Sequence, residues 1–236
     1  MDDTRYAIYF VPPAGSDLYR FGAVFLGFDC YTGADLGCPD DIDLDAGEWA
    51  ALTSEPRQYG FHATLKAPFR LAPGVTAEDL VAELQRFAAI PRTPPTIEPA
   101  IQPLGRFIAI VPGERSEEVD RLAADCVMGF DRFRRPLTAQ EKDRRLGAGL
   151  TEGQVRNLER WGYPYVFDGF RFHMTLTGPI DADRRAAIVA LLQARFNRVN
   201  GNNALRIARL VLARQDAPSA RFRVVCQAEL AALRRR

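Results

Sequence analysis

The chain contains the phrase Phe-His-x-Thr-Leu-x-x-Pro twice, once from Phe61 to Pro68 and once from Phe172 to Pro179. The two histidines of the chain, His62 and His173, each occupy the second position of this phrase. The composition of each phrase is typical of a β-strand, in which residues two apart project from the same face. The repeat therefore predicts two equivalent strands, each presenting a histidine and a threonine on one face, and hence two related halves of the fold.

The rest of the chain supports this division. Arg5–Pro12 and Arg106–Pro112 both read as strands that end at a proline, and the proline-rich run from 91 to 103 connects the halves. We expect an α+β fold with two pseudo-symmetric lobes, each with an antiparallel sheet and helices, and a site in the cleft between them. Residues 1–236 then form a single bilobal domain with approximate halves 1–100 and 101–236 and a charged helical insert at about 137–161.

Local patterns predict the remaining elements. Glycines at 22, 27, 33 and 37 indicate a loop region after the first strand. Capping residues and apolar spacing predict helices, and β-branched and aromatic runs predict strands. The expected helices span 45–52, 76–90, 116–133 and 182–196, and the expected further strands span 59–65, 96–101, 166–176, 205–213 and 221–227.

Composition narrows the class of protein. The net charge is +1, which gives no overall basic field for binding a long nucleic acid. No stretch approaches the ~20 apolar residues that span a bilayer, and the acidic, polar N-terminus does not resemble a signal segment. The four cysteines form no Cys-x-x-Cys pair, which favours reduced thiols. We expect a cytoplasmic monomer that does not bind membranes.

The paired phrases suit phosphate-ester chemistry. If the two strands face one another, one neutral imidazole of His62 and His173 can accept a proton from water while the other, protonated, donates one to a leaving alkoxide. The hydroxyls of Thr64 and Thr175 can donate to phosphate oxygens. Such a site requires no metal and no cofactor, and its partner is a small phosphorylated substrate.

Three further residues are candidates for binding the phosphate. Lys66, one of two lysines in the chain, shares the alternation of His62 and Thr64 and predicts a point charge in the site. Arg171 shares the alternation of His173 and either reaches the phosphate or lies at the rim. Tyr59 precedes the first phrase, where it either stacks on a base or sugar or packs in the core.

The paired His-x-Thr phrases resemble the signature of the two-histidine (2H) phosphoesterase superfamily. The longer phrases Tyr-Gly-Phe-His-Ala-Thr-Leu-Lys and Phe-Arg-Phe-His-Met-Thr-Leu-Thr-Gly are most similar to a bacterial branch of it that accompanies phosphonate-utilisation genes. The resemblance implies the bilobal 2H fold, with His62, Thr64, His173 and Thr175 catalytic or phosphate-binding. Lys66 and the 137–161 insert depart from the general pattern, and RNA-sized substrates are therefore less expected.

Three functions fit these observations. The first is a metal-independent phosphodiesterase that hydrolyses a small cyclic phosphate of a nucleotide or sugar, with a link to phosphonate metabolism implied by the resemblance. The second is a non-catalytic protein that binds an RNA end or a phosphorylated metabolite. The third is a metallohydrolase, which the absence of a His-x-x-Glu-His or His-x-His-x-Asp cluster argues against.

Overall fold

The computed structural model describes residues 3–40, 42–147 and 149–233. Seven strands of this part of the chain form one sheet in the order β4-β5-β6-β2-β1-β8-β9, and β3 pairs with β7 in a separate two-stranded sheet. Every strand pairing is antiparallel. The strands are β1 (Arg5–Phe10), β2 (Ala63–Phe69), β3 (Thr96–Ile97), β4 (Pro99–Leu104), β5 (Phe107–Pro112), β6 (Met174–Thr175), β7 (Leu205–Arg206), β8 (Arg209–Gln215) and β9 (Arg223–Glu229).

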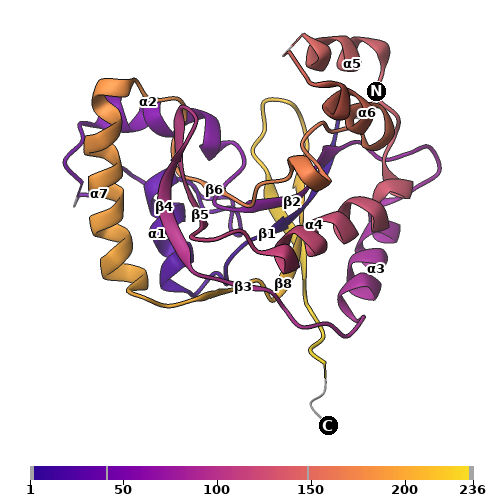
Figure 1. The fold of residues 1–236 in the computed structure, drawn as a ribbon, viewed down its shortest axis with the longest axis horizontal. Coiled ribbons are helices and arrows are strands. Elements are labelled where there is room, and N and C mark those ends of the chain that lie inside the picture. The colour runs from indigo at the N-terminus through magenta and orange to yellow at the C-terminus, as the bar shows by residue number, and fades with distance from the viewer. Residues whose placement is uncertain (1–2, 41, 148, 234–236) are drawn as a thin grey trace.

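The helices cover the sheet in two groups, which lie on opposite sides of the view in Figure 1. Helix α3 contacts β8 and β9, and α4 contacts β2, whereas α1 packs on α7, which contacts β4. The helices are α1 (Asp17–Leu26), α2 (Ala46–Arg57), α3 (Ala77–Ala88), α4 (Glu117–Gly129), α5 (Ala139–Leu146), α6 (Glu152–Trp161) and α7 (Ala182–Asn200), with short 3-10 turns at Asp131–Phe133 and Phe167–Gly169.

The sheet order shows how the two halves are related. Strands β2 and β6, which carry the two histidine phrases, are neighbours at the centre of the sheet, flanked by β1 and β5 respectively. Helix α1 follows β1 in the chain but packs with α7 beside the second half, and α4 follows β5 but packs on β2 of the first half. Each half therefore contributes a helix to the other, which ties them into one body.

The predicted α+β class with antiparallel strands in two related halves is confirmed. The strands of both halves join edge to edge in one continuous sheet, however. The site expected in a cleft between two lobes therefore lies on one face of that sheet. The helical insert is also confirmed, as α5 and α6. None of the helices in the described ranges is long and apolar enough to cross a membrane.

The loop predicted after the first strand was wrong, because residues 17–26 form helix α1. Ser16 caps its start by accepting a hydrogen bond from the backbone N–H of Tyr19, and Gly27 ends it in the left-handed conformation with φ 73°. The glycine in the middle of this helix has a packing reason. A Cβ at Gly22 would lie 2.1 Å from Cγ of Phe61, so the missing side chain lets the Phe61 ring rest directly on the helix.

Two predicted strands also differ from the structure. The strand expected over 59–65 begins at Ala63 and continues to Phe69, and the strand expected over 166–176 is reduced to Met174–Thr175. Each histidine therefore stands immediately before its strand rather than inside it.

Because Phe61 adjoins His62, the packing of Gly22 supports the site. We predict that Gly22→Ala lowers the free energy of unfolding by about 1–3 kcal/mol, the usual cost of overpacking a core, and shifts His62. A melting curve measures the first effect. Gly153→Ala on α6 is the matched control, because its Cβ would meet only ordinary contacts at 3.8 Å or more. Equal stability of the two variants would contradict the close approach.

Candidate active site

The register of β2 against β6 brings the four motif side chains together. Ala63 pairs with Met174, so one step along each strand sets His62 opposite Thr175 and Thr64 opposite His173. Directly opposed residues on antiparallel strands project from the same face, with Cβ atoms about 4.5–5.5 Å apart. Ala63 and Met174 are fully buried on the other face, whereas the four motif residues are partly open. We call His62, Thr64, His173 and Thr175 the histidine quartet.

The same local device orients both imidazoles. Nδ1 of His62 lies 2.9 Å from the carbonyl oxygen of Gly60, and Nδ1 of His173 lies 2.7 Å from the carbonyl oxygen of Arg171. A carbonyl oxygen can only accept a hydrogen bond, so Nδ1 must donate in both rings. In the neutral state, Nε2 of each histidine is then the unprotonated nitrogen.

The threonine beside His62 completes this arrangement. Nε2 of His62 lies 3.1 Å from Oγ1 of Thr64, and since Nε2 carries no proton in this tautomer, the Thr64 hydroxyl donates to it. If a substrate oxygen accepted the hydrogen bond of the Thr64 hydroxyl instead, Nε2 of His62 would be free to accept a proton from another group.

Burial favours the neutral form of both histidines. Burial lowers the pKa of His62 to about 4; the hydrogen bond to Gly60 opposes this, and the nearby charge of His173 adds to it. Burial also lowers the pKa of His173 below its ordinary value, against the effect of its hydrogen bond to Arg171. The electrostatic effect of His173 on His62 places the two rings in one local field.

Aromatic rings enclose the quartet. The ring centroid of Tyr9 lies 3.8 Å from that of His62, Tyr59 lies 6.1 Å from His62, and Phe107 lies 5.8 Å from His173. Tyr9 and Tyr59 both contact Phe222, at 5.9 and 5.4 Å. These rings exclude water from one side of the imidazoles, which accounts for the lowered pKa values.

Tyr59 is thus beside His62, as one of its two predicted roles requires, and it is half-buried against the core as the other requires. Sequence reasoning missed Tyr9 and Phe107. Tyr9 pairs with Thr64 across β1 and β2, and only the register of the strands shows that it faces the site.

The prediction for Lys66 was wrong. Thr64 pairs with Tyr9 while Lys66 pairs with Ile8, so β2 uses two steps where β1 uses one, and a β-bulge turns Lys66 to the opposite face from Thr64. The Lys66 side chain is buried there. Its Nζ donates to the carbonyl oxygen of Val127 at 2.9 Å and forms an ion pair with Asp131 at 3.4 Å.

Arg171 also contributes no side chain to the quartet. It is exposed, and its guanidinium donates to the carbonyl oxygens of Asp168 and Phe170 within its own loop, at 3.3 and 2.8 Å. Arg171 lies three residues before β6, which begins at Met174, so the register of that strand does not place its side chain. The contribution of Arg171 is its backbone carbonyl, which orients His173.

The described ranges contain no group of three His, Cys, Asp or Glu side chains arranged to hold a metal ion. The four cysteines are free thiols. The titratable groups of the site are therefore the two imidazoles and the surrounding phenols.

The protein thus has an α+β fold in which the two His-x-Thr phrases meet on paired strands at the centre of the sheet. The model of the family described as "Protein of unknown function (DUF1045)" matches residues 64–223, a range that contains Thr64 and the whole second phrase. The chain belongs to this family.

Two curated relatives are similar over much of the chain. Ribose 1,5-bisphosphate phosphokinase PhnN of Janthinobacterium sp. (strain Marseille) is 36% identical over 222 residues, which cover 93% of this chain and 49% of that protein. The protein of the same name from Laribacter hongkongensis (strain HLHK9) is 34% identical over 182 residues, covering 75% and 40%. The chain thus spans about half, or less, of the length of these relatives.

Two solved structures are also similar. The conserved protein of unknown function ATU0111 from Agrobacterium tumefaciens str. C58 has a TM-score of 0.43 at 13% identity, over 95% of this chain and 85% of the other. E. coli LigT, crystallised in complex with 3'-AMP, has a TM-score of 0.42 at 12% identity, over 98% and 99% of the respective chains.

The position of Lys66 leads to a prediction about stability. Lys66→Met should lower the free energy of unfolding by about 1–3 kcal/mol, since it leaves a buried carbonyl without its donor, while the histidine quartet stays intact. Chemical denaturation measures the loss. Lys142→Met is the control, because Lys142 pairs with Glu159 at a half-exposed position. A Lys66 variant of unchanged stability would contradict the buried role.

Proposed function

We propose that this protein is a metal-independent phosphodiesterase of the 2H type that hydrolyses a small cyclic phosphate ester of a nucleotide or sugar. The observation that carries the proposal is the histidine quartet, in which two neutral imidazoles with the same tautomer stand beside two hydroxyls on one face of the sheet. Binding alone would be served by arginines, which hold phosphate without a proton-transferring group. The link to phosphonate metabolism belongs to the same proposal, on the resemblance of the two longer phrases.

In the proposed reaction, the cyclic phosphate lies between the two imidazoles. His62 accepts a proton from a water molecule at Nε2 while the water oxygen bonds to phosphorus. The bond from phosphorus to one ring oxygen breaks, and that oxygen takes a proton from Nε2 of His173. Thr64 and Thr175 donate to the non-bridging oxygens, where negative charge accumulates. The products are a phosphomonoester and a free hydroxyl, with one water consumed.

The roles of the two histidines follow from their surroundings. His62 has the pKa of about 4 and stays unprotonated over a wide range of pH, so we assign it as the base. Repulsion between the two rings disfavours protonating both at once, so we assign His173, whose pKa is also lowered by burial, as the acid. A bound phosphate anion would raise the pKa of both rings.

The name of the curated relatives describes a kinase, and we propose that this chain corresponds to a different part of them. Neither of its two lysines stands in the Gly-x4-Gly-Lys-[Ser/Thr] loop by which P-loop kinases hold phosphates. The chain covers about half of the length of the Janthinobacterium relative, which leaves the other half of that protein for phosphoryl transfer.

The histidines can be tested by substitution. We expect His62→Ala and His173→Ala each to lower kcat for a nucleoside 2′,3′-cyclic phosphate by about 10²–10⁴, the usual contribution of acid–base catalysis, without lowering the melting temperature. Arg171→Gln should keep near-full activity, because only its backbone meets the site. The activity should also withstand a chelator. A histidine variant at the wild-type rate, or activity restored only by zinc or manganese, would overturn the mechanism.

The pH dependence follows from the two pKa values. The base must be unprotonated, so kcat/KM should rise as pH increases through about 4; the acid must be protonated, so it should fall above the pKa of His173, which lies below 6.5. The expected profile is a bell with its maximum on the acid side of neutrality, and its limbs belong to the coupled pair. A profile that rises steadily to pH 8 would contradict the assignment.

A further inference from the structure

A cavity of about 710 Å³ opens where α5 meets the start of β1, the end of β2 and the loop between β8 and β9. Six arginines line it, and we call this space the arginine pocket: Arg5, Arg70, Arg134, Arg135, Arg144 and Arg145. Its lining includes two carboxylates, those of Asp3 and Glu141. In a chain of net charge +1, this is a local concentration of positive charge.

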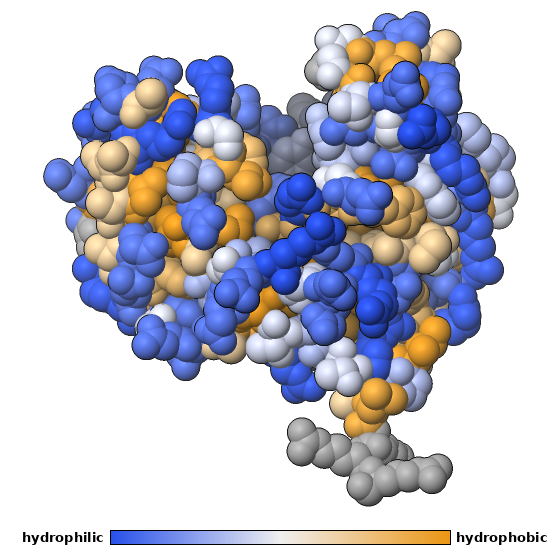
Figure 2. Space-filling model, viewed as in Figure 1, coloured by the Kyte–Doolittle hydropathy of each residue, from blue (hydrophilic) through white to orange (hydrophobic). Residues whose placement is uncertain are grey.

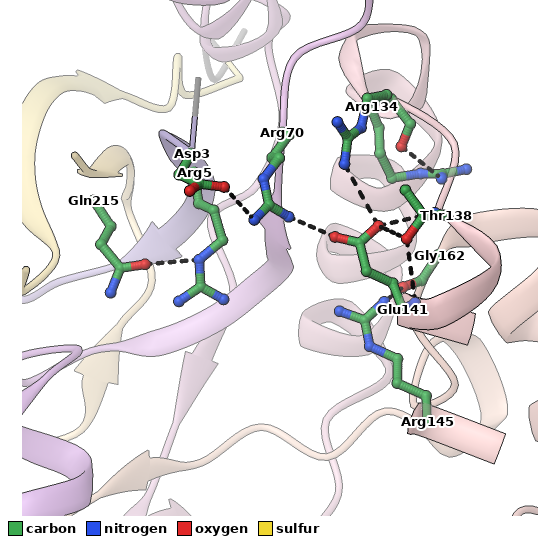
Figure 3. A network of polar contacts seen from close by, with 10 residues as sticks. Asp3, Arg5, Arg70, Arg134, Thr138, Glu141, Arg145, Gly162 and Gln215 are labelled. Carbon is green, nitrogen blue, oxygen red and sulfur yellow. Dashed lines mark hydrogen bonds and ion pairs between the residues drawn. The ribbon is translucent and has the colours of Figure 1, made fainter. Parts of the chain in front are cut away.

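The carboxylates neutralise only part of the pocket. Arg70 forms ion pairs with Asp3 at 3.0 Å and with Glu141 at 2.5 Å, and Glu141 also lies 3.5 Å from Arg135. Arg134 pairs with Asp131, outside the lining, at 2.9 Å. In the view of Figure 3, Arg5 and Arg145 stand on either side of this central network.

Arg5 and Arg145 have neutral partners instead. Nε of Arg5 donates to the side-chain oxygen of Gln215 at 2.7 Å, and Nη1 of Arg145 donates to the carbonyl oxygen of Gly162 at 2.9 Å. Across the described ranges, no carboxylate lies within 4.0 Å of either guanidinium. Burial lowers the pKa of Arg145; Glu141 opposes this, and the charges of Arg5 and Arg144 add to it. Two partly desolvated like charges thus face one space, and a bound anion would relieve their repulsion.

Arg5, in the wall of the arginine pocket, lies on the same face of the sheet as the histidine quartet. Arg5 and Tyr9 are four residues apart on β1, whose register with β8 is regular, so both point to the face shared with Thr64. Side chains connect the two places: the Arg5 guanidinium lies 5.5 Å from the Phe222 ring, which contacts Tyr9, which contacts His62. At ~3.3 Å per residue, Arg5 is about 13 Å along the strand from Tyr9.

The insert contributes side chains close to both places. Arg145 comes from α5, and Tyr163, which follows α6, interacts electrostatically with both Arg145 and Tyr59. Figure 2 shows a notch in the surface between this insert and the part of the molecule that contains α2 and α7. The insert has no counterpart in the first half, so it adds a feature that the paired strands alone do not supply.

We propose that the arginine pocket binds a second phosphate group of the substrate, through Arg5 and Arg145, while the histidine quartet acts on a cyclic phosphate at the other end of the same molecule. This inference rests on the proposed function and narrows the substrate class to phosphorylated sugars or nucleotides that carry both groups. Arginine suits this task, since its planar fork binds phosphate oxygens in pairs.

The test compares two substrates that differ in one group: cytidine 2′,3′-cyclic phosphate and the same compound with a 5′-phosphate. We expect the wild type to prefer the 5′-phosphorylated compound by at least about tenfold in kcat/KM, the equivalent of one charge-assisted contact. In Arg5→Gln and Arg145→Gln this ratio should fall toward one. Arg156→Gln, on the exposed surface of α6 and paired with Glu152, is the matched control and should keep the preference.

A binding measurement separates the two proposals. Ribose 5-phosphate, but not ribose, should bind to the His62→Ala/His173→Ala variant in a calorimetric titration, and adding Arg145→Gln should abolish that binding. Melting curves check that each variant is folded.

The outcomes are distinguishable. Equal rates on the two cyclic substrates in the wild type would overturn the second-phosphate site and leave the phosphodiesterase standing. Binding that requires Arg145, with neither compound turned over, would support the site and overturn the proposed activity. Binding of ribose 5-phosphate that survives Arg145→Gln would overturn the assignment of the site to the arginine pocket.

Discussion

The pairing of Ala63 with Met174 joins the two halves of the chain at the centre of the sheet, and the arrangement of the site depends on it. Both side chains are fully buried, so a slip of one residue in either strand would drive a histidine into the core and expose an apolar side chain. Burial of these side chains on the helix-covered face therefore fixes the register, and the register places the histidine quartet on the other face.

The position of each histidine just before its strand has a physical consequence. Inside a strand, the carbonyl two residues earlier would take part in the ladder or point away from the ring. Before β2, Gly60 adopts a φ of 71°, and before β6 the chain leaves a 3-10 turn, so in both cases a carbonyl is free to meet Nδ1. A Cβ at Gly60 would come within 2.7 Å of Cβ of Cys30, so this turn requires glycine. Two unrelated local conformations thus give the same tautomer.

The two repeated phrases predicted that His62, Thr64, His173 and Thr175 share one face, and the pairing of Ala63 with Met174 agrees with this, although each histidine precedes its strand. Strand alternation failed at Lys66, where the bulge in β2 reverses the faces; a bulge arises from pairing with another strand and leaves no clear mark in the bulged segment. Helix α1 carried readable signals, a serine cap and a closing glycine, but Gly22 lowered its apparent propensity, and the reason for that glycine is a ring far away in the chain. The arginine pocket could not be predicted from the sequence either, because its lining comes from separate segments of both halves that meet only in the folded protein.

The net charge of the chain predicts weak attraction of anions, whereas the arginine pocket predicts strong attraction. Which of the two applies depends on how close the anion is to the guanidinium groups. A net charge of +1 indicates no strong long-range field, because beyond a Debye length of ~8 Å physiological salt screens the charges of the surface. A phosphate inside the arginine pocket is closer than that to guanidinium groups whose partners are neutral. The field it meets is local and strong, while a long nucleic acid would also meet the acidic parts of the surface. A nearly neutral protein can in this way be selective for a small, highly charged substrate, and the placement of Arg5 and Arg145 in relation to the histidine quartet would set the length of the molecule it accepts.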